Sequence, residues 1–260
     1  MTQLQKQASM FAVNKPVQRP LGSNRILLYG REGVGKSTIA AGFPKSAVID
    51  TEGSHREFEI ARADARTWPA FLDSVNEAVA GAPGKIDTII VDSITEAYNL
   101  CRKYVLEREG WEKEQDGGGF GAGWAMVRGE FRHPLNALFD LYENHGVGLV
   151  FVTHEEIETV ETGTGDYSII KPMLPDNKKE DSIGVLISRV FDGIYRYSTE
   201  GMDGTPQHVL TTHKDGVFTA KDRTARMPKR IVVPELDKGT PTERAKQVFT
   251  IINNAYEGNN

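Results

Sequence analysis

A short glycine-rich segment near the N-terminus constrains the fold of this chain more than any other feature. The apolar run Arg25–Tyr29 is followed at once by GREGVGKST, residues 30–38, which matches the pattern G-x-x-x-x-G-K-[ST]. Glycines let backbone N–H groups curl around phosphate oxygens, and a helix starting at the lysine adds partial positive charge. A glycine-rich turn that merely caps a helix is the alternative. The order of strand, loop and helix favours a phosphate-binding loop (P-loop).

The side chains of this loop predict a nucleotide bound with magnesium. Lys36 would reach the β- and γ-phosphates, and the Ser37 hydroxyl would ligate Mg²⁺. A second apolar run, Thr88–Asp92, ends in an aspartate of the kind that orients the water shell of that Mg²⁺. We expect ATP and Mg²⁺ as cofactors. ATP is favoured over GTP because the sequence has no Asn-Lys-x-Asp motif, which recognises guanine. The residues expected to contact the nucleotide are Gly30, Arg31, Glu32, Gly33, Val34, Gly35, Lys36, Ser37 and Thr38.

Strand-like and helix-like segments alternate along the first part of the chain. This alternation predicts an α/β fold with a mostly parallel central sheet flanked by helices, and antiparallel edge strands in the C-terminal half. The expected strands are 25–29, 47–50, 88–92, 148–153, 193–197 and 208–212, and the expected helices lie near 36–42, 67–80, 93–109 and 125–144. An amphipathic helix, capped by Thr240 or Thr242, is expected over 241–256.

The organisation expected from this pattern is an N-terminal arm over 1–23, an ATPase core over 24–232 and a C-terminal helical tail over 233–260. No apolar run is long enough to span a bilayer, and the N-terminus lacks the apolar region of a signal peptide. The single cysteine, Cys101, fits a reducing compartment and is expected to be a buried structural residue. We therefore expect a cytoplasmic protein with no membrane partner. The net charge of −5 does not exclude a local basic groove for nucleic acid.

Hydrolysis of a nucleotide needs a group that activates or orients the attacking water. The residue after Asp92 is Ser93, so this group must come from another part of the chain. Glu52 follows the strand at 47–50, and sites in open α/β sheets lie at the carboxyl ends of the strands. We therefore predict Glu52 as the catalytic carboxylate, and a structural role for Asp50.

These segments together resemble the RecA-type recombinases. V-I-D-T-E-G (residues 48–53) after a P-loop, followed by I-I-V-D-S (89–93), is similar to their pattern, in which such a glutamate activates water. GLVFVTH (148–154) stands where those proteins carry a strand ending in a γ-phosphate sensor, usually Asn-Gln, whereas this chain has Thr-His. That departure, the short length and the segment 217–230 are more similar to phage-encoded ATP-binding proteins with a RecA core, the Sak-four-like single-strand annealing group.

The resemblance covers about residues 24–232 and implies a RecA-like P-loop NTPase core. It implies that His154 senses the γ-phosphate, the alternative being a core or capping histidine. The segment 220–228 resembles the basic K-x-K element that reaches into a neighbouring subunit's ATP site, with Lys221 and Arg223 as the counterparts. A solvated basic edge strand is the alternative there.

By the same resemblance, two segments correspond to the loops that hold single-stranded DNA, residues 111–128 and 155–185. Aromatic side chains stack on bases without strong sequence preference, and basic side chains neutralise phosphates. The expected DNA contacts are Phe120, Trp124, Arg128, Tyr167, Lys171, Lys178 and Lys179. Solvated surface loops are the alternative, and several acidic residues in the second segment count against a basic groove. Phe11 in the arm would anchor it on a neighbouring subunit's sheet or pack against its own domain.

The leading functional hypothesis is a DNA-dependent ATPase that binds single-stranded DNA and promotes annealing or strand exchange in phage homologous recombination. Its expected partners are single-stranded DNA, further copies of the chain in a filament or ring, and a single-strand-binding protein or exonuclease. A phage-encoded protein of this kind would act in the host cytoplasm. A hexameric RecA-fold helicase or translocase is the second hypothesis, and a small-molecule P-loop kinase the third.

Overall fold

The structure is a computed structural model, and it describes residues 17–161, 163, 165–175, 182–202 and 205–258. Its centre is one sheet with the strand order β10-β8-β7-β1-β5-β4-β2-β3, to which β6 and β9 are added beside β5 and β7. The strands are β1 (Arg25–Gly30), β2 (Ser46–Asp50), β3 (Ala61–Asp64), β4 (Thr88–Asp92), β5 (Gly148–Val160), β6 (Tyr167–Pro172), β7 (Gly193–Met202), β8 (Thr205–Thr211), β9 (Lys221–Asp222) and β10 (Arg230–Val233).

The direction of the strands confirms the predicted fold class. β1 runs parallel to β5 and β7, and the remaining pairs of the first half, β5–β4, β4–β2 and β2–β3, are also parallel. β8 and β10 then extend the sheet as antiparallel strands. All the parallel strands therefore end at the same edge of the sheet, which is where the polar residues predicted for the site follow them.

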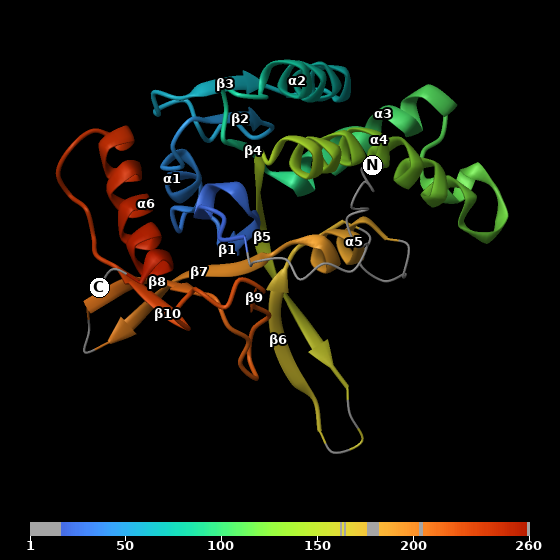
Figure 1. Ribbon diagram of the computed structural model, residues 1–260. Coiled ribbons are helices and arrows are strands. Elements are labelled where there is room, and N and C mark those ends of the chain that lie inside the picture. The colour runs from blue at the N-terminus through green and yellow to red at the C-terminus, as the bar shows by residue number, and fades with distance from the viewer. Residues whose placement is uncertain (1–16, 162, 164, 176–181, 203–204, 259–260) are drawn as a thin grey trace, which may run out of the picture.

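Helices cover both faces of this sheet. They are α1 (Lys36–Ala41), α2 (Trp68–Gly81), α3 (Ile94–Glu109), α4 (Ala122–His145), α5 (Ile183–Val190) and α6 (Pro241–Glu257). Alternate residues of β1 point to opposite faces of the sheet. Leu27 and Tyr29 pack with α2 to α5, whereas Ile26 and Leu28 pack with α1 and α6. Figure 1 shows the two groups of helices on opposite sides of the sheet. None of the helices in the described part of the chain is both long and apolar enough to cross a membrane.

The structure corrects the expectation that residues 155–185 form a loop. β5 continues past the sheet to Val160 and pairs with β6, from Glu155 opposite Pro172 to Val160 opposite Tyr167. This hairpin projects from the body of the molecule (Figure 1). Its outer residues are mostly exposed on both faces, so the sequence shows no apolar alternation that would reveal a strand. The expectation of a loop over 111–128 is also too long, because α4 begins at Ala122.

The predicted C-terminal helix is confirmed as α6, and its cap is Thr240. The Thr240 hydroxyl accepts a hydrogen bond from the Glu243 backbone N–H at 3.2 Å, and the Glu243 carboxylate accepts one from the Thr240 N–H at 2.8 Å. α6 lies directly against the end of α1 at Gly42. A Cβ atom at Gly42 would lie 2.2 Å from the Ala245 carbonyl oxygen and 2.8 Å from the Phe249 Cβ. The close approach of the two helices therefore depends on glycine.

We expect Gly42→Ala to destabilise the protein by about 1–3 kcal/mol, because the added methyl group would clash with the backbone of α6 at Ala245. The melting temperature should fall by roughly 3–10 °C in differential scanning fluorimetry. Gly42 has a φ of −78°, so the backbone itself accepts alanine. The matched control is Gly81→Ala on α2, where no atom lies within 4 Å of the new Cβ. Equal melting temperatures for Gly42→Ala and the parent would contradict the packing argument.

Candidate nucleotide site

The P-loop joins β1 to α1 and turns sharply at its glycines. Gly35 adopts a left-handed φ of +101° immediately before α1. At Gly30, a Cβ atom would lie 2.0 Å from the Tyr197 carbonyl oxygen on the neighbouring strand β7. The first glycine is thus required by close packing and the second by backbone conformation. Both features fit a cradle of backbone N–H groups at the start of α1.

A cavity of about 290 Å³ opens at this loop, along the edge where the parallel strands end. Its wall brings together five of the predicted side chains: Lys36, Ser37, Glu52, Asp92 and His154. They come from the ends of β1, β2, β4 and β5, which lie side by side in the sheet. Glu32, Gly33 and Gly35 complete the loop side of the wall.

Asp92 accepts hydrogen bonds from three side chains of the site. Its Oδ2 accepts hydrogen bonds from the Ser37 hydroxyl at 2.7 Å, the Ser54 hydroxyl at 3.1 Å and the His55 Nε2 at 2.8 Å. Burial raises the pKa of Asp92, but these hydrogen bonds and the charge of His55 outweigh it, and the net pKa lies below the ordinary value. An ionised carboxylate beside a hydroxyl is a pair of hard oxygen donors, which suits Mg²⁺. Ser37 and Asp92 therefore fit the predicted metal site.

Lys36 is buried under the P-loop. Its ammonium group donates to the carbonyl oxygens of Gly30 at 3.0 Å and Arg31 at 2.7 Å. Burial lowers the pKa of Lys36, and the negative charges of Asp92 and Glu52 counteract this effect. The cation is thus held inside the curve of the loop, where phosphate oxygens would be bound.

Glu52 is held in the cavity by a turn built around Asp50. The Asp50 carboxylate accepts four backbone N–H groups, those of residues 52 to 55, all within 3.2 Å. This arrangement confirms the structural role predicted for Asp50. Glu52 itself accepts a hydrogen bond from the Ser93 hydroxyl, and its Oε1 lies 3.7 Å from the His154 Nε2. Its side chain is 33% exposed, so water can reach the carboxylate.

A buried carboxylate joins the P-loop to the start of the projecting hairpin. Glu155, whose side chain is 8% exposed, accepts hydrogen bonds from Arg31 at 3.1 Å and from Arg196 on β7 at 3.0 Å. Arg31 is otherwise directed to solvent, with 78% of its side chain exposed. Arg31, predicted as a nucleotide contact, is therefore linked to β5 next to His154.

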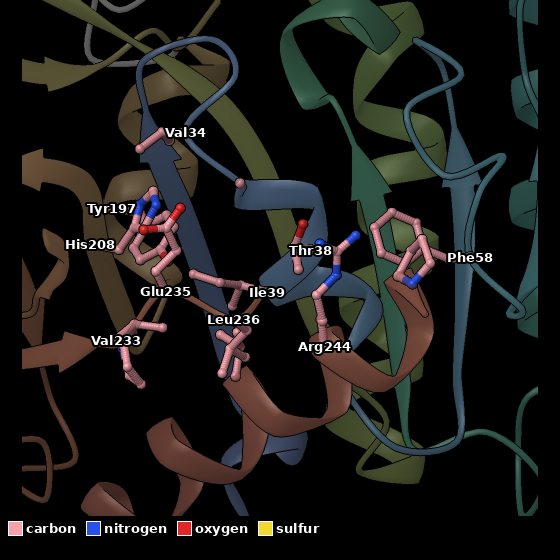
Figure 2. Close-up of a pocket in the computed structure, with 14 residues that line it drawn as sticks. Val34, Thr38, Ile39, Phe58, Tyr197, His208, Val233, Glu235, Leu236 and Arg244 are labelled. Carbon is pink, nitrogen blue, oxygen red and sulfur yellow. The ribbon is translucent and has the colours of Figure 1, made fainter. Parts of the chain in front are cut away.

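Figure 2 shows a second cavity, of about 300 Å³, and Gly35 is a lining residue of both cavities. Val34 of the P-loop and Thr38 of α1, the remaining predicted nucleotide contacts, also line this cavity. Across it lie Tyr197 and His208, whose rings stack with centroids 5.5 Å apart, together with Glu235. Arg244 projects into it from α6. This second cavity was not predicted, because its walls come from segments that lie far apart in the chain.

The predicted DNA contacts lie in different environments. Phe120 is fully exposed, Tyr167 is 48% exposed and Trp124 is half-buried. Lys171 forms ion pairs with Glu156 at 3.4 Å and Glu158 at 2.8 Å, so hairpin carboxylates offset its charge. Arg128 is only 6% exposed, because that face of α4 packs into the molecule, so little of its side chain is accessible to DNA. Lys178, Lys179 and Phe11 lie outside the described residues.

Lys221 and Arg223 lie against the end of α5 within their own chain. The Lys221 ammonium donates to the Ser188 carbonyl at 2.6 Å, and the Arg223 guanidinium donates to the Arg189 carbonyl. Burial, with the charge of Arg223, lowers the pKa of Lys221 to about 8. Among the described residues, the walls of the P-loop cavity include neither of them.

Ser54 and His55 belong to the site but were not predicted as part of it. Both follow Glu52 in the turn around Asp50 and both contact Asp92. The only available signal was the cluster of polar residues after T-E-G, which does not reveal which side chains turn inward.

Comparisons with known proteins were made at the level of families, curated proteins and solved structures. A family model described as an AAA domain matches residues 23–224. Two similar solved structures are the crystal structure of the RadB recombinase and that of the flagellar accessory protein FlaH from Methanocaldococcus jannaschii. The first is 13% identical with a TM-score of 0.42, covering 75% of this chain and 82% of RadB. The second is 12% identical with a TM-score of 0.43, covering 82% of this chain and 85% of FlaH. No curated protein matches the sequence significantly.

Proposed function

The chain belongs to the AAA domain family and is a P-loop NTPase, and from this premise we propose a Mg²⁺-dependent ATPase that binds single-stranded DNA and promotes annealing or strand exchange in homologous recombination. The observation that carries the ATPase part is the convergence of Lys36, Ser37, Asp92 and Glu52 in one cavity. The proposed assembly is a homo-oligomer, with a single-strand-binding protein or exonuclease as a further partner.

Each of these residues has a separate role in the proposed hydrolysis. Lys36 binds the β- and γ-phosphates, while Ser37 and Asp92 hold the cation. When bound, Mg²⁺ supplies positive charge that offsets the charge of the phosphate oxygens. Glu52 accepts the proton of the water that attacks the γ-phosphorus, as the bond to the β-phosphate oxygen breaks and ADP leaves. The contacts of Glu52 with Ser93 and His154 support this role, since they orient its carboxylate.

The second cavity is the proposed site of the nucleoside. It meets the phosphate cavity at Gly35, so one ligand can extend across both. Its volume of about 300 Å³ and its mixture of aromatic and aliphatic walls suit a base and ribose. Glu235 and Arg244 provide one acceptor and one set of donors for the polar edges of the nucleoside.

Phe120 supports the proposed contact with single-stranded DNA. It is fully exposed, although exposure of an apolar aromatic ring to water is unfavourable, and it has glycines on both sides. Its φ of +59° is unusual for a bulky residue and costs free energy, on the order of 1 kcal/mol. Strained, exposed residues of this kind concentrate at functional positions. An aromatic ring presented in this way can stack on bases.

We expect single-stranded DNA to bind in a salt-sensitive manner and to stimulate ATP hydrolysis. Phe120→Ala should weaken that binding by roughly 5- to 100-fold, the range for loss of one base-stacking contact. The slope of affinity against salt should not change, because the phosphate contacts remain. Fluorescence anisotropy with a labelled oligonucleotide measures the affinity and its dependence on salt. A coupled assay measures ATP hydrolysis with and without DNA.

The matched control is Val232→Ala, which removes another exposed apolar side chain, 47% exposed on β10. It should leave DNA affinity unchanged. A parental protein that hydrolyses ATP equally with and without DNA, and does not bind the oligonucleotide at low salt, would overturn the DNA part of the proposal. Displacement of an annealed strand during hydrolysis would instead indicate a helicase.

A further inference from the structure

His55 is a buried histidine that contacts the proposed metal-binding carboxylate. Its side chain is completely buried, and its ring packs 5.7 Å from the ring of Phe58. Its Nε2 lies 2.8 Å from the Asp92 Oδ2. Its Nδ1 is also buried and has no hydrogen-bond partner among the described residues. Asp92 is therefore the one polar group that the ring serves in the described part of the chain.

The roles of the two groups follow from their chemistry. The Asp92 Oδ2 also accepts hydrogen bonds from the Ser37 and Ser54 hydroxyls, so it acts as an acceptor in this site. Nε2 must therefore carry the hydrogen in this contact. The structure tolerates an unpaired, buried Nδ1, which costs free energy. This cost is consistent with a ring placed for its contact with Asp92.

The position of His55 is fixed by the same turn that positions Glu52. The His55 backbone N–H donates to the Asp50 Oδ2 at 3.1 Å. One turn thus directs Glu52 into the cavity and His55 beneath Asp92. A shift of this turn would move the proposed water-activating group and the support of the metal-holding group together.

The hydrogen bonds to Asp92 are not equivalent once a cation is considered. All three side-chain donors found in the described residues reach Oδ2. Ser37 is itself a proposed metal ligand, so its hydroxyl oxygen is needed by the cation. Of the other two, His55 makes the shorter contact, at 2.8 Å against 3.1 Å for Ser54. His55 is therefore the donor best suited to hold Oδ2 while Ser37 serves the metal.

We propose that His55 is a positioning residue that holds the Asp92 carboxylate in the orientation required for Mg²⁺ binding. The proposal rests on the proposed function, because it concerns the metal of that site. Donors that orient a metal-holding carboxylate commonly affect metal affinity by 10- to 100-fold. The effect should therefore appear in the metal dependence of nucleotide binding rather than in nucleotide binding alone.

The test uses the full chain and a fluorescent ATP analogue, titrated with MgCl₂ and, separately, measured in EDTA. His55→Phe removes the donor but keeps a planar ring beside Phe58. We expect the Mg²⁺ concentration for half-maximal binding to rise by roughly 10-fold or more. Affinity in EDTA should stay within about twofold of the parent, since no phosphate contact is lost.

Two further variants separate positioning from packing. His55→Gln can place an amide N–H near the position of Nε2 and should restore most of the Mg²⁺ dependence, whereas the shorter His55→Asn should not. This comparison applies even if His55→Phe does not fold. Equal Mg²⁺ midpoints for the glutamine, asparagine and parental proteins would overturn the role of His55. A parental protein that binds no nucleotide at any Mg²⁺ concentration would instead overturn the proposed function.

Discussion

Glu52→Gln will lower the rate of ATP hydrolysis by roughly 10²- to 10⁴-fold, the usual contribution of a general base. The amide has the shape of the carboxylate and can still accept a hydrogen bond from Ser93. It cannot take a proton from water. Nucleotide affinity should stay within about twofold, because Lys36 and the P-loop hold the phosphates. Steady-state phosphate release gives the rate, and equilibrium titration with a fluorescent ATP analogue gives the affinity.

The control for this variant is Glu57→Gln, which makes the same chemical change five residues further along the same segment. Glu57 is exposed and is not among the residues that line either cavity in the described part of the chain. Its variant should keep the parental rate. If Glu52→Gln hydrolyses ATP as fast as the parent, Glu52 is not the base, and the resemblance to recombinases loses its main chemical support.

The predictable part of the site consists of residues that end a buried parallel strand. Asp92 closes an apolar run, and Glu52 and His154 follow two others, so membership of one parallel sheet is enough to bring them to one edge. The strand that precedes Glu52 also adjoins the strand of Asp92, since β2 pairs with β4. The orientation of Lys36 and Ser37 follows in the same way from the position of the P-loop at the start of α1.

The residues that escaped prediction depend on contacts that the local sequence does not encode. Ser54 and His55 point to Asp92 because Asp50 gathers the backbone N–H groups of their turn, and this cannot be inferred from residue type. The burial of Arg128, which was predicted as a DNA contact from its charge, likewise depends on how α4 packs, and its residue type does not reveal this. The outer half of β5 has exposed side chains on both faces, so burial leaves no periodic pattern in its sequence.

The second large effect concerns Arg223, and its position makes a role within the same chain's site difficult. The guanidinium donates to the Arg189 carbonyl at the end of α5, and Lys221 holds the preceding carbonyl of Ser188. Two cations at the negative end of a helix are well placed structurally. Arg223 is nevertheless exposed, so its charge remains available to a second copy of the chain. A role in ATP hydrolysis would therefore be exerted on a neighbouring subunit.

We expect Arg223→Ala to bind nucleotide with nearly parental affinity and to hydrolyse it roughly 10³- to 10⁵-fold more slowly, as when an arginine supplied in trans is removed. The matched control is Lys229→Ala, an exposed basic residue in the same segment. It should hydrolyse ATP at the parental rate. Thermal melting of both variants checks that α5 remains folded without the Arg223 contact.

Mixing two inactive variants distinguishes action in trans from structural damage. Arg223→Ala retains Glu52, and Glu52→Gln retains Arg223, so a head-to-tail interface between them contains one complete site. In an equimolar mixture about one quarter of the interfaces should have this composition, and activity should return to about that fraction of the parental value. A structural defect in Arg223→Ala would not be repaired by a partner. Absence of any recovery, in an assembly shown to contain both variants, would therefore rule out the trans role and leave Arg223 as a cap for α5.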